Sequence, residues 1–233
     1  MEVCCGNIAS VRAAIEGGAD RVELCRDLEL DGLTPSREMI GEAVGLCHPA
    51  GLLVHVLIRS REGDFVYDDT EVKKMADEIG MAIAEGADGV VVGALTPGGD
   101  IDTAACRKWI DAVRQAVGDQ RRNVTFHRAF DVCDDPIEAI GQIARLGCNR
   151  ILTSGQQATA EQGIPLLRQL VEKAREISAK SGHELGILCG AGVNTHNAST
   201  ILKATGATEI HGSLRTGLVS DAEKIRLVKE AIS

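Results

Sequence analysis

The sequence predicts a closed barrel of eight parallel β-strands, each followed by an α-helix. Two observations lead to this α/β class. Short β-rich runs alternate with helical patterns along all 233 residues, and one related stretch of sequence returns at regular intervals. Such alternation is typical of parallel sheets, because a crossover helix must carry the chain back to the start of the next strand.

The expected strands and helices follow one another without interruption. The strands are expected at 2–5, 21–25, 52–59, 89–95, 123–130, 150–154, 184–190 and 209–213. The helices are expected at 8–17, 36–47, 69–85, 102–117, 136–146, 160–180, 195–205 and 220–232. Two helices carry start signals. Thr34-Pro35 puts proline at the first helical position, and Asp68 with Glu71 fits a capping box.

The repeated stretch has one pattern at four places. It reads GGADRVEL at 17–24, EGADGVVV at 85–92, LGCNRILT at 146–153 and TGATEIHG at 205–212. In each, glycine ends a helix, a small residue follows, a polar residue turns the chain and a strand begins. The spacing of 59–68 residues equals two strand–helix units, so the four quarters predict a TIM (β/α)8 barrel. We expect residues 1–233 to form a single domain, with the turns at Ala19, Ala87 and Ala207 opposite the functional face.

Composition excludes several classes of partner. The apolar fraction of 44% is ample for a core, whereas 25 basic against 34 acidic residues give a net charge of −9. A negative chain lacks the cationic surface that nucleic acids and anionic membranes require. No apolar run approaches the ~18 residues of a membrane span. A strand pattern that starts directly after Met1 leaves no room for a signal peptide. We therefore expect a cytoplasmic protein.

The chain contains eight cysteines and no C-x-x-C knuckle, which argues against a zinc ribbon. In a reducing compartment they are expected to be thiols, and most free cysteines are small buried hydrophobes. For Cys4 and Cys25 this core-filling interpretation and a functional one are equally supported.

Alternation along the strands predicts which polar side chains point into the barrel. Each of these expected strands places a polar set on one face: Glu2 with Cys4; Glu23 with Cys25; His55 with Arg59; Thr125 with His127; and His211 with Ser213 and Arg215. Barrel interiors are mostly aliphatic, and buried charges are costly unless they are paired. The set therefore predicts a small-molecule site at the carboxyl ends of the strands, where Glu2, Glu23, Arg59, His127 and Arg215 should converge. A structural network of paired Glu and Arg is the alternative.

Two glycine-containing loops predict an anion site. The run ILCGAGVNTHNA at 187–198 reads as a strand, a glycine-rich turn and a helix capped near Asn194, while HGSLR at 211–215 ends the last strand. Loops after strands 7 and 8 hold phosphate in many TIM barrels, and LTSGQ at 152–156 could join them. The expected ligand-binding residues are Thr153, Ser154, Gly190, Gly192, Ser213 and Arg215. Glycine-rich loops are also common in barrels without any ligand.

The loop at 59–71 contains two aromatic residues, Phe65 and Tyr67, in a polar setting. It reads either as an ordinary loop packed on the barrel or as a lid or subunit contact. We expect a homo-oligomer, with a dimer favoured.

Several runs together resemble the CutC family of copper homeostasis proteins. They are EVC (2–4), GGADRVELC (17–25), GLTPS (32–36), GDFVY (63–67), GADGVVVGALTPGGDID (86–102), VTFHRAFD (124–131), RILTSG (150–155) and EIHGSLR (209–215). The resemblance spans nearly the whole chain and implies a cytoplasmic TIM barrel linked to copper. It also implies that Cys4 and Cys25 are the metal ligands, and soft thiolates do favour Cu(I).

The sequence departs from the family pattern at two loops. Residues 189–192 read Cys-Gly-Ala-Gly where Pro-Gly-Gly-Gly is common, and residues 59–62 read Arg-Ser-Arg-Glu where Arg-Pro-Arg-Gly is usual. The first change puts the anion site after strand 7 in doubt. Cys5 lies outside the family motif, and Cys189 is a candidate for a third soft ligand.

The sequence therefore supports two alternative functions. Copper homeostasis, by Cu(I) binding at Cys4 and Cys25, is the leading prediction because of the resemblance. It does not explain the inward Glu, His and Arg residues. The alternative is a barrel enzyme that acts on a small anionic or phosphorylated metabolite. In it Glu2 or Glu23 would be the general base, His127 the general acid or its partner, and Arg59 the anchor for the anion. The sequence does not select a reaction.

Overall fold

A closed barrel of eight parallel strands forms the centre of the protein. The computed structural model describes residues 1–117 and 122–233. Strands pair in sequence order, and β8 closes the ring against β1. The strands are β1 (Glu2–Cys5), β2 (Arg21–Leu24), β3 (Leu53–Leu57), β4 (Gly89–Val92), β5 (Asn123–Phe126), β6 (Arg150–Thr153), β7 (Gly186–Cys189) and β8 (Glu209–Gly212). The predicted TIM barrel is therefore confirmed.

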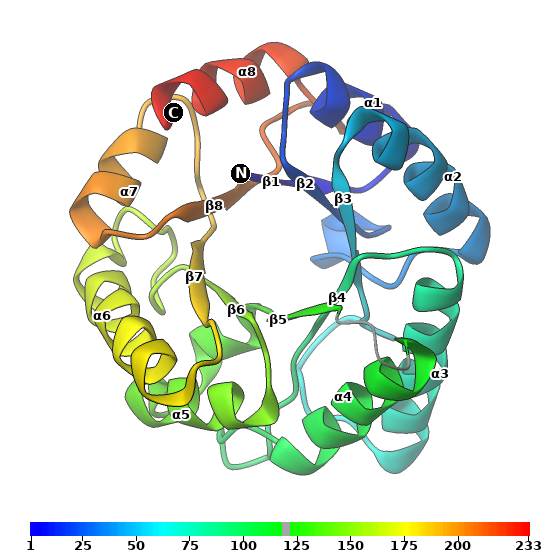
Figure 1. The fold of residues 1–233 in the computed structure, drawn as a ribbon, viewed down its shortest axis with the longest axis vertical. Coiled ribbons are helices and arrows are strands. Elements are labelled where there is room, and N and C mark those ends of the chain that lie inside the picture. The colour runs from blue at the N-terminus through cyan, green and yellow to red at the C-terminus, as the bar shows by residue number, and fades with distance from the viewer. Residues whose placement is uncertain (118–121) are drawn as a thin grey trace.

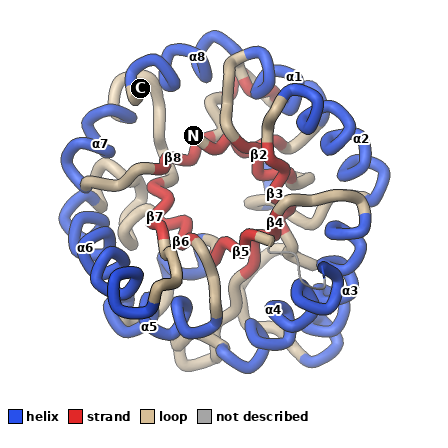
Figure 2. The backbone as a smooth tube through the Cα atoms, viewed as in Figure 1, coloured by secondary structure: helices blue, strands red, loops and turns tan. Residues whose placement is uncertain are grey.

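The helices surround this ring, as Figures 1 and 2 show. They are α1 (Ile8–Glu16), α2 (Arg37–Cys47), α3 (Asp69–Ala84), α4 (Thr103–Val117), α5 (Pro136–Leu146), α6 (Ile164–Ser181), α7 (Ala198–Thr205) and α8 (Ala222–Ala231). A short antiparallel pair, β9 (Arg215–Thr216) and β10 (Val219–Ser220), comes between β8 and α8. No helix in the described part of the chain is long and apolar enough to cross a membrane.

Local capping explains where two of the helices begin. The capping box before α3 is present: the Asp68 carboxylate accepts the Glu71 N–H, and the Glu71 carboxylate accepts the Asp68 N–H. The start predicted for α2 was too early. Ser36 is the N-cap and accepts the Met39 N–H, so Thr34 and its proline precede the helix. The Thr34 hydroxyl is instead buried against β3 and α3, where it contacts the Arg59 backbone and Glu78.

Most strands are shorter than predicted because the chain turns directly after the last barrel residue. The run at 123–130 was expected to be a strand, but β5 ends at Phe126. His127 then accepts the Ala129 N–H and starts a 3-10 segment over Arg128–Val132. The turns at Ala19, Ala87 and Ala207 lie directly before β2, β4 and β8, as expected.

The main hydrophobic core fills the layer between strands and helices. Its largest side chains are Trp109, Phe126 and Phe130, all fully buried. Tyr67 packs edge-on against Trp109 at 5.9 Å between ring centroids and is buried. The barrel interior, by contrast, contains charged residues.

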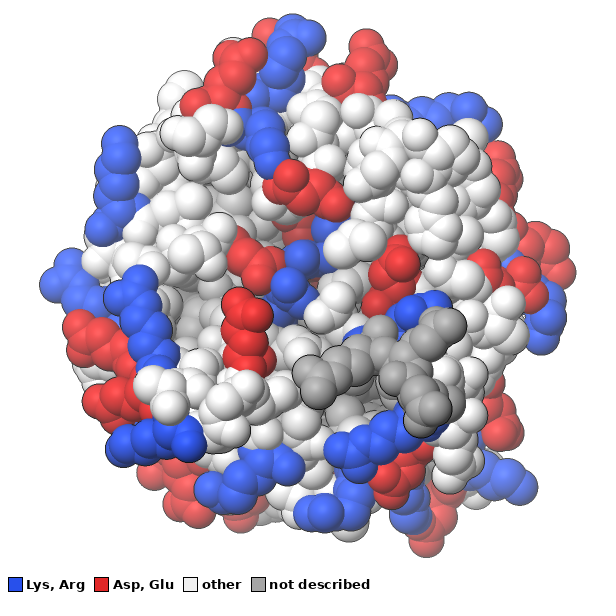
Figure 3. Space-filling view, viewed as in Figure 1, with Lys and Arg blue, Asp and Glu red and all other residues white. Residues whose placement is uncertain are grey.

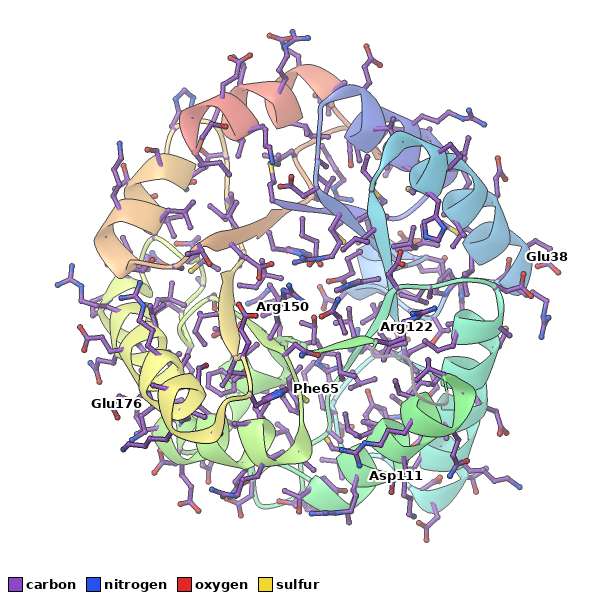
Figure 4. All side chains as sticks on the ribbon, viewed as in Figure 1. Glu38, Phe65, Asp111, Arg122, Arg150 and Glu176 are labelled. Carbon is purple, nitrogen blue, oxygen red and sulfur yellow. The ribbon has the colours of Figure 1, made fainter. Side chains whose placement is uncertain are left out.

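A network of ion pairs crosses the barrel near the starts of the strands. Arg21 Nε lies 2.5 Å from Glu2 and its terminal nitrogen 2.7 Å from Glu209, which in turn lies 2.7 Å from Arg150 Nε. Figure 4 shows Arg150 projecting into the ring of strands, and the central hollow of Figure 3 holds acidic and basic side chains together. A paired structural network therefore exists, at the end of the barrel that the sequence prediction did not consider.

Candidate functional site

A cavity of about 290 Å³ opens at the carboxyl ends of the strands. Four of the predicted site residues line it: Cys4, Glu23, Arg59 and His127. The remaining lining residues are Asp31, Leu57, Phe65, Arg128, Asp131, Val132, Leu152 and His211. The cavity thus combines acidic, basic and apolar walls, as small-molecule sites usually do.

The two predicted thiol ligands lie side by side. Cys4 Sγ and Cys25 Sγ are 3.9 Å apart, and both residues are buried. With Leu57 and Val91 they form a separate apolar cluster inside the barrel. The contact with Cys25, together with burial, raises the pKa of the Cys4 thiol well above its usual value. In the absence of a metal, Cys4 is therefore a neutral thiol.

The other two candidate thiols lie elsewhere. Cys5 and Cys189 pack in the main core between the strands and the helices. Burial raises the pKa of both thiols, that of Cys189 to about 12. Cys189 is therefore not placed to be a third ligand.

His211 brings a nitrogen close to the Cys4 thiol. Ligand atoms of Cys4, Glu23 and His211 all lie within 4.8 Å of one another. The sequence analysis placed His211 on an inward face but did not assign it a role. Burial lowers the pKa of His211, but the carboxylates of Glu23 and Glu2 and the Cys4 contact outweigh it and raise that pKa well above its usual value.

Glu2 contacts the His211 ring and helps to position it. It was predicted to be a catalytic base, but it is fully buried and does not line the cavity. Its Oε1 lies 2.8 Å from His211 Nδ1 and its Oε2 bonds Arg21. Burial raises the pKa of Glu2, yet Arg21 and His211 reverse the effect and hold it well below its usual value. Glu2 is a permanent anion that positions other groups.

Glu23 is the carboxyl group with the properties of an acid or base. It is 5% exposed, lines the cavity, and its Oε2 has no hydrogen-bond partner among the described residues. Burial raises the pKa of Glu23 to about 7, against the opposing attraction of His211 and Arg21. A carboxyl group with a pKa near neutrality can both take and give a proton.

His127 is held in one neutral form. Its Nδ1 accepts the Ala129 N–H at 3.1 Å, so the ring proton is on Nε2, for which the described residues offer no partner. Burial and the charge of Arg59 lower the pKa of His127 to about 3. A neutral imidazole of this kind donates a hydrogen bond from Nε2 and is not a protonated acid. Gly93 makes room for it, since a Cβ there would lie 2.5 Å from Nδ1.

Arg59 is a buried cation whose partners, among residues 1–117 and 122–233, are uncharged. Its guanidinium donates to the carbonyl oxygens of Leu30, Gly32 and Gly63 at 2.8–3.3 Å. The same cation lies 5.1 Å from the centre of the Phe65 ring. Its side chain is on the cavity wall, as the anchor role requires.

The loop residues predicted to bind an anion do not form one site. The Thr153 hydroxyl and the Ser154 N–H both donate to Asp131, so their donors are already used. A Cβ at Gly190 would lie 2.6 Å from Leu152, which indicates close packing of neighbouring strands. Asp131 itself was missed, although its place at the end of VTFHRAFD put it at a strand carboxyl end.

Arg215 does not converge with the other predicted residues. The chain leaves the barrel after Gly212, and Leu214 adopts a left-handed φ of 46°, which breaks the strand alternation. Arg215 is exposed and lines a separate groove with Ser213, Asn194, His196 and Lys224. Gly192 has φ of 69° and its carbonyl accepts from Asn194 and Asn197. An N-cap at Asn194 would start helix α7 at residue 195. The helix starts three residues later, at Ala198.

Comparison with known proteins identifies the family. The model of the CutC family matches residues 1–216. The chain belongs to the CutC family. It is 45% identical to a CutC family protein of Pasteurella multocida, over 91% of this chain and 80% of the relative. It is 48% identical to one of Bacteroides thetaiotaomicron, over 95% of this chain and 83% of the relative.

Solved structures agree. A CutC protein of Streptococcus agalactiae that is named for copper homeostasis is 34% identical, with a TM-score of 0.82, covering 91% of this chain and 97% of that chain. Thiamine phosphate pyrophosphorylase of Pyrococcus furiosus, at 17% identity, a TM-score of 0.63 and coverage of 99% and 94%, shares the fold alone. The predicted family is therefore confirmed.

Proposed function

We propose that this CutC protein acts in the cytoplasm and binds Cu(I) through the thiolates of Cys4 and Cys25. The observation that carries the proposal is the 3.9 Å separation of the two sulfur atoms, since Cys4 lines the cavity and Cys25 is buried next to it. Two thiolates are the preferred donors for Cu(I), which is a soft ion. The surrounding apolar residues, Leu57 and Val91, would keep water from a bound ion.

His211 is the third donor in this proposal. An imidazole nitrogen also suits copper, whereas the carboxylate of Glu23 is a harder ligand. Since Nδ1 of His211 contacts Glu2, the other ring nitrogen is left for the metal. A carboxylate behind a ligating histidine is a common arrangement that fixes the ring and raises its basicity.

Anaerobic Cu(I) titration of the reduced protein against a competing chelator tests this function. We expect one ion per chain, and an affinity at least about a hundredfold weaker for Cys4→Ser and for Cys25→Ser. Cys5→Ser is the matched control, because this thiol belongs to the same strand but packs in the outer core. Equal affinities for the wild type and the Cys4→Ser/Cys25→Ser variant would refute the assignment.

An enzyme acting on a small anionic metabolite is the second candidate. It is favoured by the partnerless buried atoms of Glu23, Arg59 and His127 around one cavity. In this function Glu23 is the general base and Arg59 holds the anion. Hydrogen–deuterium exchange of candidate metabolites in D2O, followed by NMR, tests it, and Glu23→Gln should abolish any exchange that the wild type catalyses.

A further inference from the structure

The positive charge of Arg59 lies in the wall of the cavity, and the described residues offer it no counter-ion. Arg59 is only 4% exposed, and in the described residues no carboxylate forms an ion pair with it. Its Nε–H has no hydrogen-bond partner among them either. Burying a cation without an anion is costly, because neutral carbonyl groups replace only part of its hydration. Such a site is stabilised by an anion that enters from outside.

Arg61, by contrast, is an arginine whose charge is paired within the protein. It belongs to the same loop, stacks on Tyr67, and is paired with both Asp64 and Glu71. Its charge is neutralised within the protein. The loop therefore carries two arginines on aromatic rings. Arg59 lines the cavity and has no ion-pair partner in the part of the chain that the structure describes, whereas Arg61 is paired.

A second donor lies beside Arg59. The Phe65 ring lies 5.0 Å from the His127 ring and 5.1 Å from the Arg59 guanidinium, so the three side chains form one wall. Because His127 Nδ1 accepts the Ala129 N–H, its Nε2–H is a fixed donor without a partner in the described residues. A cation and a neutral N–H donor on one wall are suited to the two oxygen atoms of a carboxylate.

Carboxyl groups of the lining limit the charge of the ligand. Glu23 and Asp31 line the cavity and would repel a dianion, whereas the charge of Asp131 is offset by its ion pair with Arg128. The volume of about 290 Å³ lies at the lower end of the range for small-molecule sites. Leu57 and Leu152 offer apolar contacts for its body, and Glu23 Oε2 can accept a hydrogen bond from a hydroxyl group.

We propose that the cavity binds a small monocarboxylate, with its oxygen atoms held by Arg59 and by Nε2–H of His127. This inference deepens the second proposed function, for which it names the substrate class, and it is independent of copper binding. The carboxylate lies against the Arg59–Phe65–His127 wall, and its body faces Glu23 and the apolar residues.

NMR-detected titration of the reduced, metal-free protein tests the proposal. The probes are lactate and acetate, with inorganic phosphate as the comparison. We expect saturable binding of lactate that shifts the His127 and Phe65 signals, and weaker binding of phosphate. Arg59→Gln should weaken lactate binding by at least about tenfold, and His127→Phe by about threefold to tenfold.

Two control variants make the result decisive. Arg61→Gln removes an arginine from the same loop and should leave lactate affinity within about twofold, since its charge is already paired. Cys5→Ser, at a thiol that packs in the outer core and does not line the cavity, should also retain lactate binding. Absence of saturable carboxylate binding, or equal losses in Arg59→Gln and Arg61→Gln, would overturn the proposal. Tighter binding of phosphate would overturn the ligand class while leaving the enzyme candidate in place.

Discussion

His211 Nδ1 lies 2.8 Å from Glu2 Oε1, deep inside the barrel, and this contact connects the ion-pair network to the functional cavity. Glu2 is held on its other oxygen by Arg21. His211 reaches the cavity wall, where it lies close to Cys4. The charged layer near the strand starts therefore positions a group at the thiol pair.

Removal of the Glu2 charge should destabilise the protein strongly. Glu2→Gln retains the shape of the side chain but leaves Arg21 and His211 without their buried anion. Breaking a buried ion pair costs about 3–5 kcal/mol, so the free energy of unfolding in urea should fall by that amount. Glu209→Gln, at a partly exposed carboxylate of the same network, is the control and should cost less. Equal small losses would mean that the network contributes little to stability.

Acid should destabilise the folded protein through its buried neutral histidines. Burial lowers the pKa of His55 to about 4, in spite of Glu2 at 3.7 Å. Below about pH 6.5 the unfolded chain takes up a proton that folded His55 does not, so stability falls with pH down to about 4. His55→Leu should remove up to about 3 kcal/mol of this loss, measured as unfolding free energy across that range. His196→Leu, at an exposed histidine, is the control, and an unchanged pH dependence in His55→Leu would contradict the assignment.

Two glycine-to-alanine substitutions should have opposite effects. At Gly93 a new Cβ would lie 2.5 Å from the His127 ring, so Gly93→Ala should displace the ring and cost about 1–3 kcal/mol. At Gly80, inside α3, nothing lies within 4 Å of a Cβ, and Gly80→Ala should gain up to about 1 kcal/mol. Thermal unfolding measures both effects. A neutral Gly93→Ala with unchanged His127 NMR signals would show that the ring has room to move.

Copper binding should depend on pH. The raised pKa of the Cys4 thiol means that Cu(I) must displace a proton from it. The apparent Cu(I) affinity should therefore fall by about tenfold per pH unit of acidification for each proton displaced. Chelator competition between about pH 6 and about pH 8, corrected for the chelator's own protonation, measures this slope. A flat profile would indicate ligands that carry no proton.

The sequence predicted the barrel and the inward faces well, because strand alternation and the strand–helix period are local properties. Cys4, Glu23, Arg59 and His127 line one cavity for that reason. The rule failed for Arg215, since a single left-handed residue, Leu214, ended the alternation. Strand alternation also predicts the direction of two residues to which it was not applied, Arg21 and Glu209. Arg21 precedes Glu23 by two residues and Glu209 precedes His211 by two, so both point inward and their ion pairs could have been inferred.

The roles of the inward residues could not be predicted in the same way. Glu2 and Glu23 look equivalent in sequence, each two residues before a cysteine. Glu2 meets Arg21 and His211 and stays ionised, whereas Glu23 has a pKa of about 7 and a free oxygen. That difference depends on contacts between strands far apart in the chain, which only the closed barrel brings together.

Separate cavities lie at the two ends of the barrel. No lining residue is shared between the cavity at the strand carboxyl ends and the hollow that contains Arg150 and Glu209 at the other end. Cys4 and Arg59 both line the first of these cavities. An ion at Cys4 and an organic acid at Arg59 would therefore share it. The ligand that binds second would control the release of the ligand that bound first. Occupancy of one site would therefore set the exchange rate of the ligand at the other.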